Sequence, residues 1–353
     1  STSRGLGDVY KRQIFISGGD QDWTPHILHL VLARTGTLEE GTRGLSLFLV
    51  PSHDEAGRRT AVKVTRIEEK MGLHGSPTCQ LAYDGPMGTL LGSEGGGLRA
   101  MFTLMNHARL EVALQGLAHA ARASHIARSY AAERRQGGRV IAGHADVARM
   151  LDEAEALALG GRLVTLTTMV ELSEKGDSPL VDFMTPVAKV LGTEAGITAS
   201  DLGIQVLGGY GYLREYRVEQ AWRDARITAI YEGANGIHAR TLATRGLKHA
   251  GGAGADAFEA MIAARPELAA PLRLWRVARA HLLESARPEE FAHAFMKLTT
   301  ALALAQACGR LADAAASSPD PERYRRAAAC VTTRTLNEAI RWSSQCGAEP
   351  AAA

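Results

Sequence analysis

The stretch Gln205–Ile237, QVLGGYGYLREYRVEQAWRDARITAIYEGANGI, lies between two helical patterns and decides how the chain is organised. Gly208, Gly209 and Gly211 lack side chains where a helix must end and where a backbone can approach a ligand closely. A helix cap followed by a turn accounts for these glycines as well as a ligand-binding loop does. The glycines alone therefore leave both interpretations open.

Glu232 is the second special feature of this stretch. It follows an apolar run that ends at Ile230 and precedes Gly233. A carboxylate in apolar surroundings is a stronger base than one in water, which suits the removal of a proton from carbon. The alternative is a solvated glutamate at the start of a loop or helix. Taken by itself, the position of Glu232 allows both.

Helical periodicity extends on both sides of this stretch. Leu110, Leu114 and Leu117 share one face of a helix that we expect to end near residues 137–138. Another helix is expected to begin near Thr185–Pro186, since proline suits the first helical turn, and to stop at Gly208. The other predicted helices cover about residues 144–173, 218–224, 235–246, 266–283, 287–317 and 320–345.

The segment before these helices has the pattern of strands. Its short runs partly alternate between apolar and polar residues, and Gly, Pro or charged turns separate them. This pattern predicts part of an antiparallel sheet. The runs are HILHLVLA (26–33), GLSLFLVP (44–51), AVKVTRIE (61–68) and TCQLAYDG (78–85).

Together the patterns predict an α+β fold that is mostly α: a partial antiparallel β-domain (14–91), a four-helix bundle (92–247) and a C-terminal helical extension (248–353). The sequence GGAGAD at 251–256 is typical of a flexible linker. Residues 1–13 include SRGLGDVYKRQ, which resembles translated adaptor sequence and would then be non-native; a flexible native linker is the alternative. Both interpretations predict a chain that is cut at its N-terminus.

Composition excludes several classes of function. Of 353 residues, 40 are Lys or Arg and 38 are Asp or Glu, so the net charge of +2 provides no positive field for nucleic acid. No apolar run of about 18 residues predicts a membrane span. The four cysteines are scattered, which favours reduced thiols in a cytoplasmic protein, and no histidine or cysteine spacing predicts a metal site. A GxGxxG dinucleotide fingerprint is also missing.

Several motifs recur in an order that resembles one family. They are IFISGGD (14–20), EEKMGLHGSPT (68–78), GGGLRAMF (95–102) with NHAR (106–109), Glu133-Arg134, and the 205–237 stretch, in which Gln205 and Glu232 are 27 residues apart. This order is similar to that of the acyl-CoA dehydrogenases, over roughly residues 14–247. The KMGLHGSPT segment and the helical extension look most like the 3-methylmercaptopropionyl-CoA dehydrogenase branch. The family's N-terminal helical domain and the opening strands of its β-domain are not expected in this chain.

The resemblance implies a role for each matching residue. Glu232 matches the base that removes the substrate α-proton, and the family binds FAD and acyl-CoA. The matches on the substrate side are Asn106, Arg109, Tyr231 and Gly233, with Asn106 in place of an Asp. The matches on the flavin side are Phe15, Ile16 and Ser17 against the ring; Arg134, His144, Gln205, Gly208 and Gly209 on the ADP side, largely across a subunit interface; and Ala234, Asn235 and Gly236 after the base.

This chain departs from the family pattern at several of these positions. Phe15 and Ser17 replace Trp and Thr, which keeps an aromatic ring and a hydroxyl. Ala234 and Gly236 lack the hydroxyl and amide of the family's Thr-Ser-Gln, and Gly137 replaces an aromatic residue near the flavin. The side-chain contacts at these last three positions are therefore expected to be lost.

The resemblance also implies partners and alternatives. An electron-transfer flavoprotein would accept the electrons, and the chain would form a homodimer or homotetramer in fatty-acid metabolism. An acyl-CoA oxidase, which passes electrons to oxygen, is the alternative within the enzymes; a non-catalytic, DNA-associated relative is the alternative outside them, and the near-neutral charge speaks against it.

Overall fold

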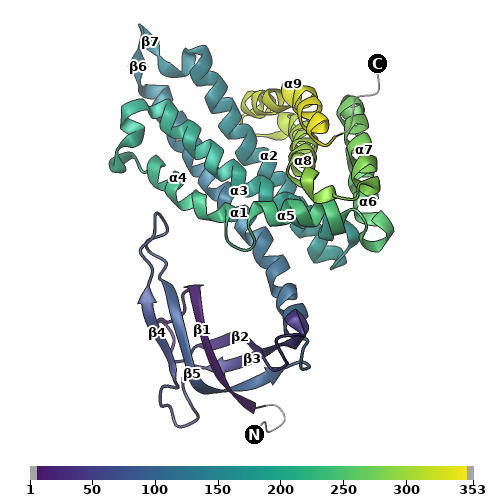
Figure 1. Cartoon of the computed structure of the whole chain (residues 1–353). Helices are drawn as coiled ribbons and strands as arrows, with labels where there is room; N and C mark the ends of the chain where they lie inside the picture. Colours follow the sequence, from purple (N-terminus) through teal and green to yellow (C-terminus); the bar gives the residue numbers. More distant parts are fainter. Residues whose placement is uncertain (1–5, 348–353) are drawn as a thin grey trace. The chain divides into compact units, whose positions relative to one another are not determined.

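The computed structural model describes residues 6–347, which form two compact units that divide between His107 and Ala108 (Figure 1). Residues 1–5 and 348–353 lie outside the described residues, and with them the start of the predicted linker (1–13) and the end of the predicted extension. The strands are β1 (Leu6–Ser17), β2 (Leu28–Arg34), β3 (Leu45–Pro51), β4 (Val62–Ile67), β5 (Thr78–Leu91), β6 (Arg135–Gln136) and β7 (Arg139–Val140). The helices are α1 (Gly97–Glu133), α2 (Ala145–Lys175), α3 (Pro179–Leu207), α4 (Val218–Arg226), α5 (Asn235–Thr241), α6 (Ala253–Ala263), α7 (Ala269–Glu284), α8 (Ala292–Ala314) and α9 (Pro321–Gln345).

The first unit is an antiparallel sheet in the order β1-β5-β3-β2, with β4 also paired to β5. Its core side chains alternate along the strands, and among them Val31, Val50 and Leu81 are almost fully buried. β1 includes residues 6–13, part of the predicted linker or non-native segment; that assignment stays a prediction, because strand pairing does not depend on the origin of a sequence.

β5 is longer than the predicted strand 78–85 and runs on to Leu91. The pairing with β1 shifts between Asp8 and Tyr10, opposite the Gly85-Pro86 dipeptide that resembled a turn. At such a bulge a proline costs no ladder hydrogen bond, so the strand continues through it.

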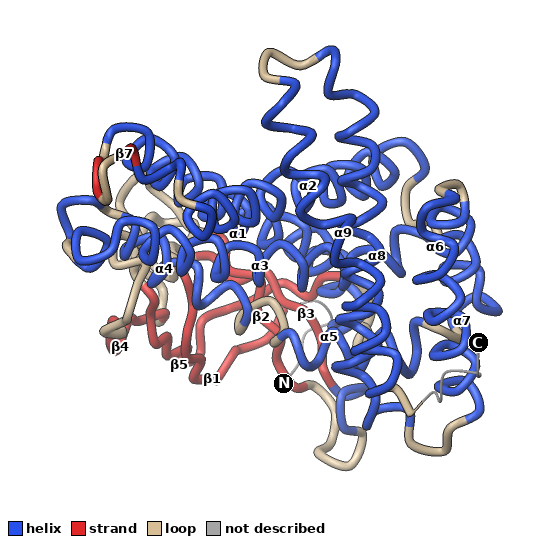
Figure 2. Tube along the Cα trace, turned by 90° about the horizontal axis from the view of Figure 1, so that it is seen from above, coloured by secondary structure: helices blue, strands red, loops and turns tan. Residues whose placement is uncertain are grey.

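The second unit contains the predicted helices. α1 begins in the first unit and continues into the second, where α1 and α3 approach so closely that a Cβ on Gly116 would lie 2.3 Å from the carbonyl oxygen of Gly192. α3 also packs against α2 and α4, which confirms the predicted helical bundle. In the view of Figure 2, α8 and α9 lie beside α2.

The predicted start of α3 at Thr185–Pro186 is wrong, because the helix begins at Pro179. Ser178 caps it: its side-chain oxygen accepts a hydrogen bond from the Val181 N–H at 3.2 Å. Pro186 lies inside the helix, where it cannot donate a hydrogen bond to the carbonyl of Asp182, an exposed residue. A proline in a helical pattern therefore did not mark the first turn here.

The flexible linker predicted at residues 251–256 is also wrong. Gly251 and Gly252 form a left-handed turn, and α6 begins directly after it at Ala253. Gly254 lies against α3, where a Cβ would meet the Pro179 carbonyl oxygen at 2.4 Å. Glycine serves close helix packing at this position rather than flexibility.

The helices beyond residue 248 pack onto the bundle and share its core. Trp275 of α7 is fully buried against Phe258 and Phe295, and its indole N–H donates to the Thr299 hydroxyl at 3.0 Å. The buried Glu155 of α2 accepts hydrogen bonds from Ser124 at 2.8 Å and from Arg323 of α9 at 3.0 Å. No helix in the described part of the chain is long and apolar enough to cross a membrane.

Candidate functional site

The loop that carries Glu232 connects a 3-10 turn (Ile227–Ala229) to α5 and has an unusual backbone. Glu232 has φ of 51° and Gly233 has φ of 92°, so two consecutive residues adopt left-handed conformations. For a residue with a side chain such a conformation costs about 1 kcal/mol or more and persists only where its surroundings enforce it. The strain makes the loop a candidate for function, and its anchors show what enforces it.

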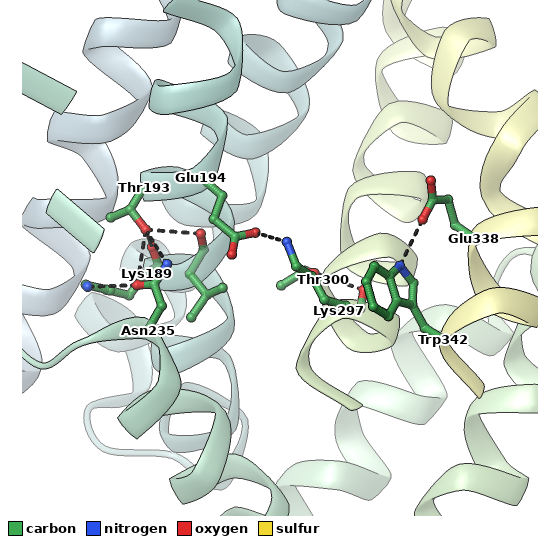
Figure 3. A network of polar contacts seen from close by, with 9 residues as sticks. Lys189, Thr193, Glu194, Asn235, Lys297, Thr300, Glu338 and Trp342 are labelled. Atoms are coloured by element: carbon green, nitrogen blue, oxygen red, sulfur yellow. Dashed lines mark hydrogen bonds and ion pairs between the residues drawn. The ribbon is translucent and has the colours of Figure 1, made fainter. Parts of the chain in front are cut away.

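Two buried side chains of α3 anchor the loop (Figure 3). The ammonium group of Lys189 donates to the Asn235 side-chain oxygen at 2.9 Å, as Figure 3 shows. It also donates to the Gly233 carbonyl oxygen at 2.9 Å. The Thr193 hydroxyl, one turn further along α3, pairs with the side chain of Asn235 at 3.1 Å. The polar end of Asn235 therefore faces α3. Its predicted role as a flavin contact stays a prediction.

His238 holds the loop from α5. It is 2% exposed, and its Nε2 lies 3.1 Å from the carbonyl oxygen of Glu232. Burial, together with the positive charges of Lys189 and Arg109, lowers the pKa of His238 to about 4. The ring is therefore neutral near pH 7, and Nε2 carries the proton that the carbonyl accepts.

We expect His238 to make the folded state sensitive to acid. Its pKa in the folded protein is depressed from the ordinary 6.5 to about 4, so its stabilising effect is complete above pH 6.5 and is lost as the pH falls through 4. The difference corresponds to about 3 kcal/mol of unfolding free energy. Urea denaturation at about pH 7 and about pH 4 measures it.

The matched variants are His238→Gln, which keeps a donor, and His125→Gln at an exposed position on α1. His238→Gln should lose less stability than wild type between the two pH values, whereas His125→Gln should lose as much as wild type. Equal losses in wild type and His238→Gln would show that the imidazole does not couple folding to protonation.

Charges of one sign surround Glu232. Burial lowers the pKa of Arg109 on α1, the charge of Arg245 lowers it further, and the Glu232 carboxylate opposes this. Burial also lowers the pKa of Lys189 to about 8, again against the attraction of Glu232. Arg109, predicted on the substrate side, is thus close enough to Glu232 to interact with its charge. Asn106 lies three residues earlier on α1 and belongs to the first unit.

Tyr231 is fixed beside the loop by α1. Its hydroxyl donates a hydrogen bond to the Gln115 side-chain oxygen, and burial raises the pKa of that hydroxyl. Gly233 lies against His238, since a Cβ there would be 2.9 Å from Nε2. Ala234 and Gly236 are exposed around the start of α5.

A second site in the same unit is a cleft of about 720 Å³. It brings together all five residues predicted on the ADP side of a flavin, although they come from separate segments. Gly137 also lines it, beside the ring of His144, whose Nε2 is 3.0 Å from the Gln136 carbonyl oxygen. The five predicted residues are Arg134, His144, Gln205, Gly208 and Gly209.

The cleft fits an anionic, partly flat ligand. The Arg134 guanidinium lies 5.7 Å from the centre of the Tyr210 ring and provides a positive charge at the wall. A Cβ on Gly208 or Gly209 would meet no atom within 4 Å, so these glycines leave open space that side chains would fill. None of the residues that line the cleft belongs to the loop around Glu232.

Phe15, Ile16 and Ser17 lie at the end of β1 in the first unit. The pairing with β5 is irregular between Gln13 and Ile16, and Phe15 has φ of 61° with 69% of its surface exposed. A bulge of this kind turns the aromatic ring out of the sheet, where it is free to contact a planar ligand.

Four residues of the loop's support were not predicted: Lys189, Thr193, His238 and Gln115. Lys189 is the single charged residue in the apolar run PVAKVLG, and such a lone charge in a buried helix is a signal of function or pairing. His238 and Gln115 carry no comparable signal. No group of three or more His, Cys, Asp or Glu among residues 6–347 is arranged to hold a metal ion.

Comparisons with known proteins found one family model and several similar sequences. Residues 95–247 match the family model of the acyl-CoA dehydrogenase C-terminal domain. The 3-methylmercaptopropionyl-CoA dehydrogenase of Ruegeria pomeroyi is 40% identical over 275 residues, which cover 71% of this chain and 47% of that protein. The chain thus spans about half the length of this relative.

Two solved structures share the fold. The structure of Caenorhabditis elegans ACDH-11 in complex with C11-CoA has a TM-score of 0.79 at 21% identity. The match covers 95% of this chain and 60% of the ACDH-11 chain. The structure of an acyl-CoA dehydrogenase from Bacillus anthracis, complexed with FAD, has a TM-score of 0.77 at 19% identity. The match covers 98% of this chain and 65% of the Bacillus anthracis chain. The sequence matches, supported by this shared fold, show that the chain belongs to the acyl-CoA dehydrogenase family and carries its C-terminal domain at residues 95–247.

Proposed function

We propose that the chain acts in the FAD-dependent α,β-dehydrogenation of an acyl-CoA thioester, with Glu232 as the base that removes the α-proton. The observation that carries this proposal is the left-handed loop at Glu232, held by Lys189, His238 and Asn235. Among residues 6–347 no backbone carbonyl accepts a hydrogen bond from the Glu232 N–H. The same residue therefore offers a carboxylate and a backbone donor.

The carboxylate and the backbone N–H of Glu232 have different roles in removing the proton. The α-hydrogen of a thioester is a very weak acid, so a carboxylate can remove it only if the negative charge developing on the thioester oxygen is stabilised. The Glu232 N–H is a preorganised donor for that oxygen, and such donors commonly contribute about 3 kcal/mol. Arg109 and Lys189 add positive charge near the same place. An acyl chain that excludes water strengthens these interactions.

The 720 Å³ cleft is the proposed site for the ADP half of FAD, with Arg134 near the pyrophosphate. FAD, when bound, would supply the acceptor for the β-hydride that no side chain can provide. Since the cleft and the Glu232 loop share no residues, we propose that each cleft serves the flavin of a neighbouring subunit in a homodimer or homotetramer. An electron-transfer flavoprotein is the proposed electron acceptor, in fatty-acid metabolism and in the cytoplasm.

The test is anaerobic titration of the FAD-loaded protein with a panel of acyl-CoAs that differ in chain length and branching. We expect the visible absorbance of oxidised flavin to bleach with at least one of them. Admission of air then separates the two enzyme classes, because slow reoxidation fits a dehydrogenase and fast reoxidation fits an oxidase. A protein that takes up no flavin, or that no acyl-CoA reduces, would contradict the proposal.

A further inference from the structure

Lys189 is the most completely buried charge in the second unit. Its side chain is 0% exposed within α3, and its neighbours Val187, Ala188, Val190 and Leu191 are buried apolar residues. An ammonium group in such surroundings is strongly destabilising unless hydrogen bonds compensate it. The contacts that compensate it therefore indicate why the charge is present.

Both of its hydrogen-bond acceptors belong to the Glu232 loop. The Gly233 carbonyl oxygen follows the base directly, and the Asn235 side chain marks the first residue of α5. One ammonium group thus ties together the two ends of the three-residue segment that leads from the left-handed Glu232 into the helix. Figure 3 shows its contact with Asn235. Thr193 fixes Asn235 from the next turn of α3, so the acceptor cannot turn away.

We infer that Lys189 is a positioning residue for the Glu232 loop: it holds the backbone of residues 233–235 so that the Glu232 carboxylate and N–H keep a fixed relation to each other. The inference rests on the proposed function, because it assigns Lys189 a purpose in proton removal by Glu232. Misplacement of a catalytic group by about 1 Å costs roughly 100-fold in rate, and releasing this loop would permit such a displacement.

Burial lowers the pKa of Lys189 and so makes its action sensitive to pH, and four titratable groups face it. Arg109 comes from α1, Glu194 from α3, Glu232 from the loop and His238 from α5. With a pKa of about 8, the ammonium is charged below that pH and neutral well above it. The loop should therefore loosen as the pH rises through about 8.

Hydrogen exchange of the peptide that covers residues 230–240 tests this without any cofactor. Lys189→Met keeps the length of the side chain but removes the charge and donors, and we expect this peptide to exchange about 10-fold faster while α2 and α9 are unchanged. After correction for the intrinsic pH dependence of exchange, wild type should lose protection above about pH 8 and Lys189→Met should show no such step. Unchanged protection with an unchanged pH profile would overturn the inference.

Two further variants guard the result. Lys297→Met removes a partly buried lysine that pairs with Glu194 but does not contact the loop, and it should leave loop exchange as in wild type. If Lys189→Met does not fold, Thr193→Val releases Asn235 with almost no change in shape and should speed exchange about 3-fold. If the loop of Thr193→Val then exchanged at the wild-type rate, Lys189 would have no positioning role.

Flavin bleaching separates this inference from the proposed function. In the FAD-loaded protein, Lys189→Met should lower kcat about 100-fold with little change in KM, because the loop is misplaced while the acyl-CoA site is kept. If Glu232→Gln bleaches normally, the proposed function is wrong. If Glu232→Gln is inactive and Lys189→Met has wild-type kcat and loop exchange, the proposed function stands and Lys189 has no positioning role.

Discussion

Replacing Glu232 by Gln is expected to lower the rate of flavin bleaching by acyl-CoA at least 1,000-fold, while flavin stays bound. Gln has the same shape as Glu but cannot take a proton, and a positioned general base contributes about 10²- to 10⁴-fold. The loop anchors contact the backbone of residues 232 and 233 and the side chain of Asn235, so the substitution leaves them in place. Stopped-flow absorbance under anaerobic conditions, with a saturating acyl-CoA, measures the effect.

The control is Glu215→Gln, an exposed glutamate in the same Gln205–Ile237 stretch. It should bleach at the wild-type rate. Circular dichroism and the flavin spectrum establish that both variants fold and hold the cofactor. If the flavin of Glu232→Gln bleached as fast as that of wild type, Glu232 would not be the base and another residue would have to remove the α-proton.

A Gly116→Ala protein is expected to lose about 4 kcal/mol of unfolding free energy. The crossing of α1 and α3 allows no methyl group there, because the new Cβ would lie 2.3 Å from the Gly192 carbonyl oxygen and 2.8 Å from the Thr193 Cα. Both are backbone atoms, so the helices must separate rather than repack a side chain. Overpacking of this kind exceeds the gain in helix propensity of about 1 kcal/mol.

Gly236→Ala is the matched substitution, and we expect it to raise the unfolding free energy instead of lowering it. Gly236 lies in the first turn of α5, has no positive φ, and a Cβ there meets no atom within 4 Å. We expect a gain of about 0.5 kcal/mol from helix propensity. Urea denaturation followed by circular dichroism compares the two variants. Equal stability of Gly116→Ala and wild type would mean that the close crossing is not required for folding.

The crossing also bears on the site. Lys189 and Thr193 lie on α3 within one turn of Gly192, and Arg109 and Gln115 lie on α1 near Gly116. The two helices that the glycines bring together are therefore the ones that provide the anchors of the Glu232 loop. A change that separates them should disturb both stability and loop geometry.

The wrong helix start and the wrong linker prediction have different physical causes. Pro186 and the glycines of 251–256 are local signals for a helix start and a flexible linker, and in isolation those interpretations are sound. In the folded chain the Ser178 cap starts α3 at Pro179, seven residues before Pro186. Gly254 packs against the Pro179 carbonyl oxygen. A helix cap within the same segment overrode the proline signal, and packing against a distant segment overrode the glycine signal.

The sequence by itself determined the class of the fold and the extent of most helices, and it predicted Glu232 as the base. The fold class and the helices follow from local patterns, namely apolar residues at helical spacing and the Gly208-Gly209 helix end. The position of Glu232 between an apolar run and a glycine left its role open, and the resemblance to the acyl-CoA dehydrogenases predicted it as the base. Tertiary structure alone decided what holds that glutamate. Lys189 and Gly233 are 44 residues apart, and Tyr231 and Gln115 are 116 apart. Their pairing depends on how α1, α3 and α5 pack, and no local pattern records it.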